Sequence, residues 1–408
     1  MRSARRGGRP LLNECLRYSD GVGCTPLPII QLLFLSAALL ACPAAIFGGA
    51  KHSEKPLRPS AELAKTLDQI TPVTLEGDLS FLASDALAGR DTPSPGLEVA
   101  AEFIASRFRA AGLEPAMDGS YFQTADLTRE AEESAKRYHI KIPGGPMVGK
   151  NVIGILRGSD AALRDTYILI SAHYDHIGTI ATAVGRAPKK APEGSTDKIY
   201  NGANDDGSGT VSVIALAEAF SKLRQKPKRS IIFIAFCGEE FGLLGSKYYA
   251  GHPVVPLNQT MANINLEQIG RTDGDIKKGS ASLTGFEYTS LGKLFQRAGE
   301  TFGIRVYRDE QADKYFRQSD NLSFAVHGIP DTTLCTSFEF PDYHGLKDEW
   351  QKIDYPTLAA IDRIVGTVVE AIANSKIRPQ WDPNIPAAEK YRKAAQALYA
   401  ADGVAASK

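Results

Sequence analysis

The sequence has little cysteine and no net charge, and both features exclude classes of protein. Its 408 residues contain five cysteines, of which only Cys237 and Cys335 lie beyond the first 50 residues. Two cysteines cannot build the disulfide framework typical of small secreted domains, which leaves one bridge or two free thiols. Basic and acidic residues each total 47, and no basic patch rich in aromatics is present. Nucleic-acid binding therefore has no support.

Internal repeats and low-complexity tracts are also missing from the chain. The hydrophobic content of 43% is enough for a large core at this length. We expect a polar segment over residues 51–73, one catalytic domain over 74–378 and a C-terminal tail helix over 379–408.

Charge is absent from a long stretch near the N-terminus. Four arginines occur in the first ten residues, and residues 21–50 contain no charged residue. A basic start before an apolar run that ends in small residues is typical of a secretory signal. A retained membrane anchor is the alternative, because the run approaches the ~20 residues that a spanning helix needs. The "LLAC" stretch that ends at Cys42 also resembles a lipoprotein cleavage box.

We therefore expect residues 1–50 to be a signal peptide or an N-terminal membrane segment. The protein would be exported and would be periplasmic, extracellular or membrane-anchored. Contact with a membrane would be limited to such an N-terminal anchor or a lipid on Cys42.

Apolar runs alternate with helical patterns along most of the chain. Buried strands are predicted at residues 151–156, 166–172, 230–236, 261–267 and 331–337, and helices near 208–223, 241–251, 286–302, 320–327 and 355–374. Two earlier helices are expected within 76–115, on either side of the loop "GRDTPSPG". This alternation predicts a three-layer α/β/α sandwich with a mixed, mainly parallel central sheet.

Histidines and carboxylates follow the predicted strands where each one ends. The residues are His173, Asp175 and His176 in "SAHYDHIG", Asp205 and Asp206 in "NGANDDGSGT", Glu239 and Glu240 in "FCGEEFGLLGS", Glu267 in "NLEQIG", and Asp342, Tyr343 and His344 in "DYHGLKDEW". Each of these residues alone could have a purely structural role, such as capping a helix or lying exposed to solvent. Together, at the carboxyl ends of strands, they suit zinc, and five ligands with one bridging suit two ions.

At these residues the chain resembles the M28 family of zinc peptidases, the bacterial aminopeptidase group with a co-catalytic dizinc centre. The resemblance covers most of residues 74–375. Its ordered motifs are "LSFLASDALAGRDTPSPG", "AHYDHIG", "NGANDDGSGT", "KRSIIFIAFCGEEFGLLGSKYY", "SDNLSFAVHGIP" and "DYHGLKDEWQKID". It implies a secreted metallo-exopeptidase of the aminopeptidase type, which would act on peptides with a free N-terminus.

The resemblance implies the metal ligands residue by residue. His173 would bind one Zn²⁺, and Asp205 would bridge two ions. Glu240 and His344 would bind the second ion. Glu267 stands where the family usually has Asp, in a motif like "NLDMIG", and we interpret it as a ligand of the first ion despite its extra methylene.

Further roles are implied around these ligands. Glu239 would be the general base, and Tyr343 would donate a hydrogen bond to the oxyanion. Asp175 would fix the tautomer of His173. Asp206 would follow Asp205 through a cis peptide bond. The pattern does not need His176, and we interpret it, with His252 and His327, as a surface or supporting polar residue.

Two positions bear on the substrate. Asn321 stands where the family often has His, so substrate specificity is in doubt there more than chemistry. Arg317 is the only candidate to anchor a substrate carboxylate, as a carboxypeptidase of the same family would need, and a plain surface role is the alternative.

Two other classes of protein are weighed against the exopeptidase. A transferase like the glutaminyl cyclases would share the fold but bind a single zinc ion. A non-catalytic receptor with this fold would have lost ligands, and Glu267 alone gives that hypothesis a foothold. Metal stoichiometry separates these alternatives.

Overall fold

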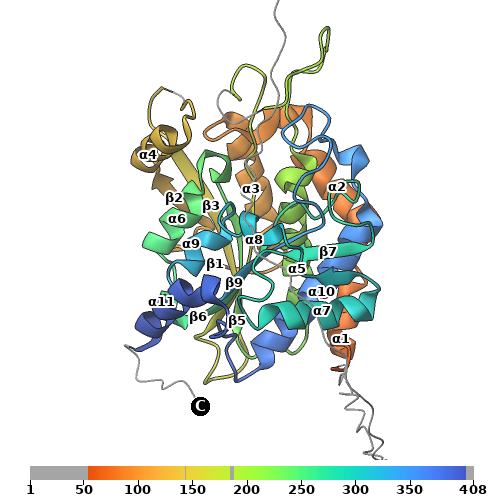
Figure 1. Cartoon of the computed structure of the whole chain (residues 1–408), viewed down its shortest axis with the longest axis vertical. Helices are drawn as coiled ribbons and strands as arrows, with labels where there is room; N and C mark the ends of the chain where they lie inside the picture. Colours follow the sequence, from red (N-terminus) through yellow and green to blue (C-terminus); the bar gives the residue numbers. More distant parts are fainter. Residues whose placement is uncertain (1–53, 143, 184–187, 401–408) are drawn as a thin grey trace, which may run out of the picture. The chain divides into compact units, whose positions relative to one another are not determined.

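The computed structural model describes residues 54–142, 144–183 and 188–400. The expected export segment at residues 1–50 and the end of the tail lie outside these ranges. Within them, no helix is both long and apolar enough to cross a bilayer. A β-sheet runs through the described part, with α2 (Pro72–Leu82) and α10 (Tyr355–Asn374) on one side and α6 (Leu244–Gly251) and α9 (Asn321–Ala325) on the other (Figure 1).

The strands are β1 (Glu114–Pro115), β2 (Phe122–Asp126), β3 (Val148–Leu156), β4 (Tyr167–His173), β5 (Ser230–Phe236), β6 (Thr260–Leu266), β7 (Ser280–Leu283), β8 (Arg305–Tyr307) and β9 (Asp331–Cys335). The other α-helices are α1 (Ala61–Leu67), α3 (Pro95–Ala110), α4 (Thr128–Tyr138), α5 (Ser208–Ser221), α7 (Leu291–Phe302), α8 (Ala312–Tyr315) and α11 (Glu389–Ala400).

The strand order places four parallel strands at the centre of the sheet. In the described residues the order is β1-β3-β5-β4-β6-β9-β7-β8, with β2 paired to β3. Strands β5, β4, β6 and β9 are parallel neighbours. Antiparallel pairs flank them, β3 against β5 and β7 against β9. The predicted α/β sandwich with a mixed sheet is confirmed, and the carboxyl ends of the four central strands share one edge.

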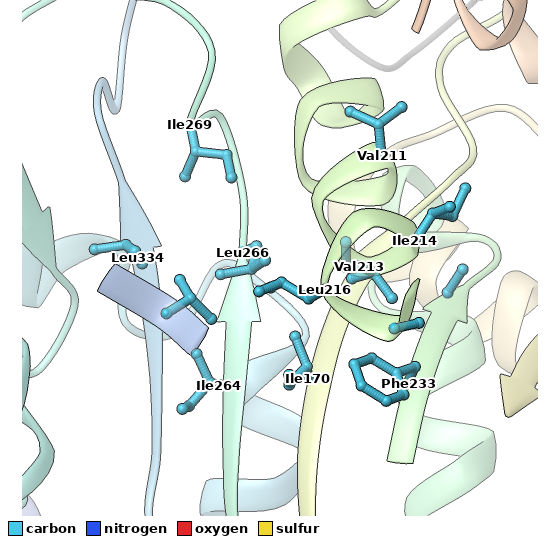
Figure 2. Close-up of a cluster of buried hydrophobic side chains, with 14 of the residues drawn as sticks. Ile170, Val211, Val213, Ile214, Leu216, Phe233, Ile264, Leu266, Ile269 and Leu334 are labelled. Carbon is cyan, nitrogen blue, oxygen red and sulfur yellow. The ribbon is translucent and has the colours of Figure 1, made fainter. Parts of the chain in front are cut away.

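Both faces of the central strands are buried, which explains their continuous apolar runs. On one face, Ile170 of β4 and Phe233 of β5 pack with Leu216 of α5 (Figure 2). On the other face, Phe236 of β5 packs against Phe324 of α9 with ring centroids 5.9 Å apart. Helices therefore clamp the sheet from both sides and hold the strand ends in fixed positions.

Sequence patterns identify the central elements better than the peripheral ones. The strand predicted at 261–267 is observed as β6, which ends at Leu266, and the helix predicted at 355–374 is observed as α10 with the same bounds. Helices α1, α4 and α8 and the outer strands β1, β2, β7 and β8 were not predicted. Helix α4 is mostly charged, and β1 is only two residues long, so neither carries a clear hydrophobic period. Cys237 and Cys335 are free and buried, so no bridge joins them.

One buried carboxylate in α10 predicts how stability depends on pH. Asp362 is fully buried, and burial raises its pKa to about 7 from an ordinary 3.8, with Ser212 opposing the shift. A raised pKa in the folded state means that stability falls as pH rises through that value. We expect Asp362→Asn to stabilise the protein by about 2 kcal/mol more at pH 8 than at pH 5, measured by denaturant unfolding.

The matched control is Asp165→Asn, which changes an exposed carboxylate. It should shift stability equally at both pH values. If Asp362→Asn also showed equal shifts at both pH values, Asp362 would not be the titrating group.

Candidate functional site

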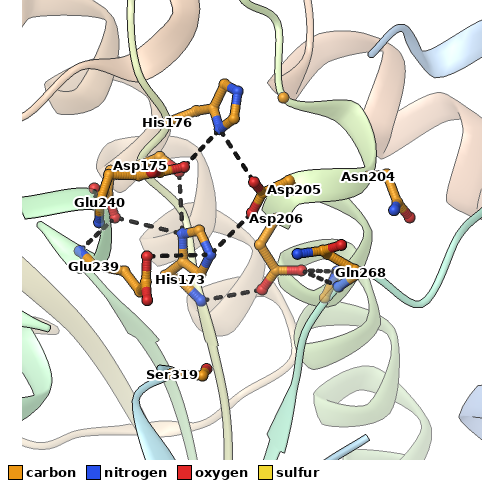
Figure 3. Close-up of polar contacts among 12 residues, drawn as sticks. His173, Asp175, His176, Asn204, Asp205, Asp206, Glu239, Glu240, Gln268 and Ser319 are labelled. Atoms are coloured by element: carbon orange, nitrogen blue, oxygen red, sulfur yellow. Dashed lines mark hydrogen bonds and ion pairs between the residues drawn. The ribbon is translucent and has the colours of Figure 1, made fainter. Parts of the chain in front are cut away.

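The polar residues predicted at separate strand ends lie together at the carboxyl edge of the sheet (Figure 3). His173 is the last residue of β4, and Glu267 directly follows β6. Glu239 and Glu240 lie in a short turn after β5. Asp205 directly precedes Asp206 in the turn that leads into α5. Residues far apart in the sequence thus meet because parallel strands end at one edge.

Asp205 lies at the centre of the group. Its Oδ1 is 3.3 Å from Nε2 of His173, and its Oδ2 is 3.3 Å from Nε2 of His344. Nε2 of His344 is also 3.2 Å from Oε2 of Glu240. One carboxylate therefore presents one oxygen to each of two histidines, which is the arrangement needed to bridge two ions.

Two groups of potential ligands share Asp205. His173, Asp205 and Glu267 form one group, and His176, Asp205 and Glu240 form the other. In each group the ligand atoms lie within 4.8 Å of one another. Glu267 thus lies with His173 and Asp205, where the sequence placed it.

His176 takes a larger part than the sequence indicated. Its Nδ1 lies 2.9 Å from Oε1 of Glu240 and 4.0 Å from Oδ2 of Asp205. The ring is fully buried and meets His344 edge-on, with centroids 5.6 Å apart. Of the two alternatives that the sequence left for His176, a surface or a supporting polar residue, its burial and its contact with Glu240 favour the supporting role. Its spacing, three residues after His173, was the available signal.

Asp175 fixes the turn that carries the two glutamates. Its carboxylate accepts hydrogen bonds from the backbone N–H of Glu239 at 3.1 Å and of Glu240 at 3.4 Å. Nδ1 of His173 lies 3.2 Å from the Asp175 carbonyl oxygen and 3.6 Å from its carboxylate. Asp175 therefore orients His173 mainly through its backbone, and its side chain positions Glu239.

Asp206 ties three elements together behind Asp205. Its carboxylate accepts hydrogen bonds from the backbone N–H of His173, Gly209 and Gln268 at 3.0–3.2 Å. These groups belong to β4, α5 and the loop after β6. The peptide bond between Asp205 and Asp206 is cis, as the family resemblance implied.

Two buried residues that the sequence did not single out support the Asp205 turn. Arg90, 1% exposed, donates to the carbonyl oxygens of Tyr174 and Gly202 at 2.7 and 2.9 Å. Burial lowers the pKa of Arg90 to about 10, while Asp175 and other carboxylates oppose the shift. Asp348 accepts from the backbone N–H of Asp205 at 3.1 Å. Arg90 and Asp348 are distant in sequence from the turn at Asp205, and no local sequence pattern links them to it. The sequence analysis therefore did not identify them.

Burial has the largest effect on the electrostatics of the centre, and neighbouring charges add to it or oppose it. Burial raises the pKa of Glu267 to about 7, with a further contribution from Asp205 and opposition from His173. Burial also raises the pKa of Glu239 well above its usual range. Burial alone would lower the pKa of His344, but Glu240 and Asp205 raise it to about 11. Glu239 and Glu267 thus lack sufficient positive charge from the protein, a situation that a bound divalent cation relieves. Asp205 differs, because His173 and His344 overcome the effect of burial and lower its pKa to about 2.

The donor set fits zinc. Imidazole nitrogen and carboxylate oxygen are ligands that zinc takes in proteins. Nε2 of His173 and Oε2 of Glu267 are buried, and neither makes a hydrogen bond within the described residues. Such atoms are costly to bury unless something binds them. We therefore regard this group as a candidate metal centre.

Of the three remaining predicted residues, only Tyr343 lies beside the ligand group and lines the adjoining cavity. Tyr343 stacks on His344 with centroids 4.1 Å apart and lines a cavity of about 150 Å³ together with Glu267. Arg317 is exposed and does not line this cavity. Asn321 is fully buried and accepts a hydrogen bond from Thr333, so it supports the cavity wall from behind.

The position of His176 predicts a role in metal retention. Replacing His176 by Ala removes the group beside Oε1 of Glu240, so we expect metal affinity at the second site to fall about 10–100-fold. The measurement is competition with a chelator, together with metal content per chain. The control is His252→Ala, an exposed histidine stacked on Tyr248. Equal metal retention in both variants would contradict the role of His176.

Comparison with known proteins agrees with this geometry. The profile of "Peptidase family M28" matches residues 151–369, more than half of the chain. A probable zinc metalloprotease of Pyrenophora tritici-repentis (strain Pt-1C-BFP) is 29% identical over 313 residues, which cover 67% of this chain and 59% of that protein. A vacuolar membrane protease of Tuber melanosporum (strain Mel28) is 27% identical over 207 residues, 49% of this chain and 18% of that protein. The chain thus spans less than two thirds of the length of these fungal relatives.

Solved structures share the fold. An aminopeptidase from Aneurinibacillus sp. strain AM-1 aligns with a TM-score of 0.54 at 18% identity, over 75% of this chain and 95% of that one. A glutaminyl cyclase of Porphyromonas gingivalis aligns with a TM-score of 0.56 at 17% identity, over 74% and 98%. At these identities the likeness concerns architecture alone. The extent of the family match identifies this chain as a member of peptidase family M28, a family of zinc metallopeptidases.

Proposed function

We propose that the chain is a dizinc exopeptidase of the aminopeptidase type, which removes residues from peptides with a free N-terminus. The observation that carries this proposal is the sharing of Asp205 by two ligand groups. A single-ion site has no need for a carboxylate that faces two histidines from its two oxygens. Two-ion sites occur in aminopeptidases, as they do in phosphatases and nucleases, and the family match favours the peptidase.

The ligands divide between two positions. His173, Asp205 and Glu267 would hold the first ion, and Asp205, Glu240 and His344 the second, with His176 beside Glu240. Zinc bound there would act as a Lewis acid that polarises the scissile carbonyl and acidifies the attacking water.

Glu239 is placed to act as the general base. Its Oε2 lies 4.0 Å from Nε2 of His173, so it borders the first position without belonging to either ligand group. Burial raises its pKa well above the usual range, which suits a group that must gain and then lose a proton near neutral pH. Glu239 would take the proton from water and deliver it to the leaving amine.

Tyr343 is placed to stabilise the oxyanion. Burial, with Asp205 and Glu240 nearby, raises the pKa of its phenol well above the usual range. The hydroxyl therefore stays protonated and can donate a hydrogen bond to the charge that develops on the carbonyl oxygen. The stack on His344 fixes the ring beside the second ligand position.

We extend the proposal to location and substrate. The charge-free stretch at residues 21–50 after a basic start supports export, with release, lipidation or anchoring as the forms it would take. Acidic groups around the centre would hold the free α-amine of the peptide.

The alternatives receive different support. A carboxypeptidase needs a cation to bind the terminal carboxylate, and the residues that line the cavity include neither Lys nor Arg. A transferase like the glutaminyl cyclases is supported by the similarity of fold, and it would hold one ion instead of two. Zinc content per chain therefore discriminates between the two leading hypotheses.

The role of Glu239 is tested by replacing its carboxylate with an amide. Because Glu239 belongs to neither ligand group, Glu239→Gln should keep the zinc content and lower kcat on amino-acid p-nitroanilides by at least about 100-fold. Glu132→Gln, which changes an exposed residue of α4, is the control and should retain activity. Unchanged turnover in Glu239→Gln would refute the assignment of the base.

Substitutions at Glu267 test the first ion position. Glu267→Ala removes a ligand and should lower zinc content from two ions per chain toward one. Glu267→Asp restores the carboxylate at the length usual in the family and should keep two ions. Zinc content after dialysis is the measurement. Two tightly held ions in the alanine variant would show that Glu267 is not a ligand.

A further inference from the structure

The cavity beside the metal centre is built from neutral and acidic side chains. It has a volume of about 150 Å³, and Glu267 and Tyr343 line it on the side of the metal centre. The other lining residues are Gln268, Thr284, Tyr315, Gln318, Ser319, Thr333, Cys335, Phe338 and Glu339. The lining contains two carboxylates, on Glu267 and Glu339. Because Glu267 belongs to a ligand group, Glu339 is the carboxylate of the lining that can interact with a substrate side chain.

One wall of the cavity is aromatic. Tyr315 and Phe338 stack with centroids 4.7 Å apart and planes 7° apart. Such a surface accommodates the methylene stem of a long unbranched side chain. The Tyr315 hydroxyl donates a hydrogen bond to Oε1 of Glu339 at 3.1 Å, which orients that carboxylate at the end of the wall.

The backbone of Glu339 is held in place by Asp275. The Glu339 N–H donates to Oδ1 of Asp275 at 3.1 Å, and the Asp275 N–H donates to the Glu339 carbonyl oxygen at 3.0 Å. Asp275 also accepts from the N–H of Phe338 at 2.8 Å. Glu339 is exposed, and the Tyr315 hydroxyl is the side-chain partner of its carboxylate in the described part of the chain. A fixed carboxylate at the end of an apolar wall is thus available to a ligand.

We propose that this cavity receives the side chain of the N-terminal substrate residue, and that Glu339 makes the enzyme prefer a basic side chain there. This inference rests on the proposed exopeptidase function, because the cavity adjoins the position of the scissile carbonyl. A lysine stem lies along Tyr315 and Phe338, and its ammonium group reaches Glu339. A glutamyl side chain of similar reach brings like charges together.

The expected preference is moderate because Glu339 is exposed to solvent. Exposed ion pairs contribute little, so the carboxylate should favour a lysyl over a methionyl substrate by about two- to fivefold. Salt should reduce this preference, since the pair lies within reach of counterions.

The test uses the zinc-loaded full chain and the p-nitroanilides of Lys, Met and Glu. Glu339→Gln should lower the Lys-to-Met ratio of kcat/KM by about two- to fivefold. Glu300→Gln, at an exposed residue of α7, is the matched control and should leave the ratio unchanged. An unchanged ratio in Glu339→Gln, or faster cleavage of the glutamyl than the lysyl substrate by the native protein, would overturn the proposal.

A binding measurement separates this inference from the proposed function. Calorimetry compares L-lysinamide with L-methioninamide on the same zinc-loaded protein. If no p-nitroanilide is cleaved but lysinamide binds more tightly, and Glu339→Gln abolishes the difference, the cavity assignment is supported and the exopeptidase proposal fails. Equal affinities for the two amides would overturn the cavity assignment.

Discussion

The structure depends on one constraint, the burial of several carboxylates within a few ångströms of one another. Asp205, Glu239, Glu240 and Glu267 converge where water is largely excluded, and the raised pKa values of Glu239 and Glu267 express the cost. Backbone N–H groups and buried Arg90 stabilise the surrounding scaffold. The ligand group itself keeps an excess of negative charge, and divalent ions are the natural means to balance it.

The sheet makes this concentration of charge tolerable. Helices pack on both faces of β4, β5, β6 and β9, so the strand ends cannot separate to relieve repulsion. Asp206 links the ends of β4 and β6 to the start of α5, and Asp175 holds the turn after β5. These two carboxylates use backbone N–H groups, which leaves the imidazoles free for metal. Asp175 and Asp206 therefore differ from the carboxylates of the ligand groups mainly in their hydrogen-bond partners, which are backbone N–H groups.

Much of this arrangement could be predicted from sequence, and the reason is the regularity of the fold. The central strands have continuous apolar runs, and parallel strands bring the residues after them to one edge. His173, Asp205, Glu240 and Glu267 could thus be grouped without coordinates, and the structure brings them together.

The rest could not be predicted, because it depends on how loops fold. The position of His176 depends on a loop contact, because its own backbone N–H donates a hydrogen bond to the carbonyl oxygen of Arg90. Arg90 in turn has a positive φ of 48°, which the sequence does not indicate. Asp348 reaches Asp205 across more than 140 residues of sequence. Arg317 and Asn321 show the converse. Both were predicted on the substrate side, and neither lines the cavity although Gln318 and Ser319 between them do.

The central claim is that two ions share Asp205, and anomalous diffraction at the zinc edge tests it most directly. Crystals of zinc-loaded protein should show two peaks about 3.5–4 Å apart, one beside His173 and Glu267 and the other beside Glu240 and His344. A single peak, or a pair that Asp205 does not bridge, would contradict the account.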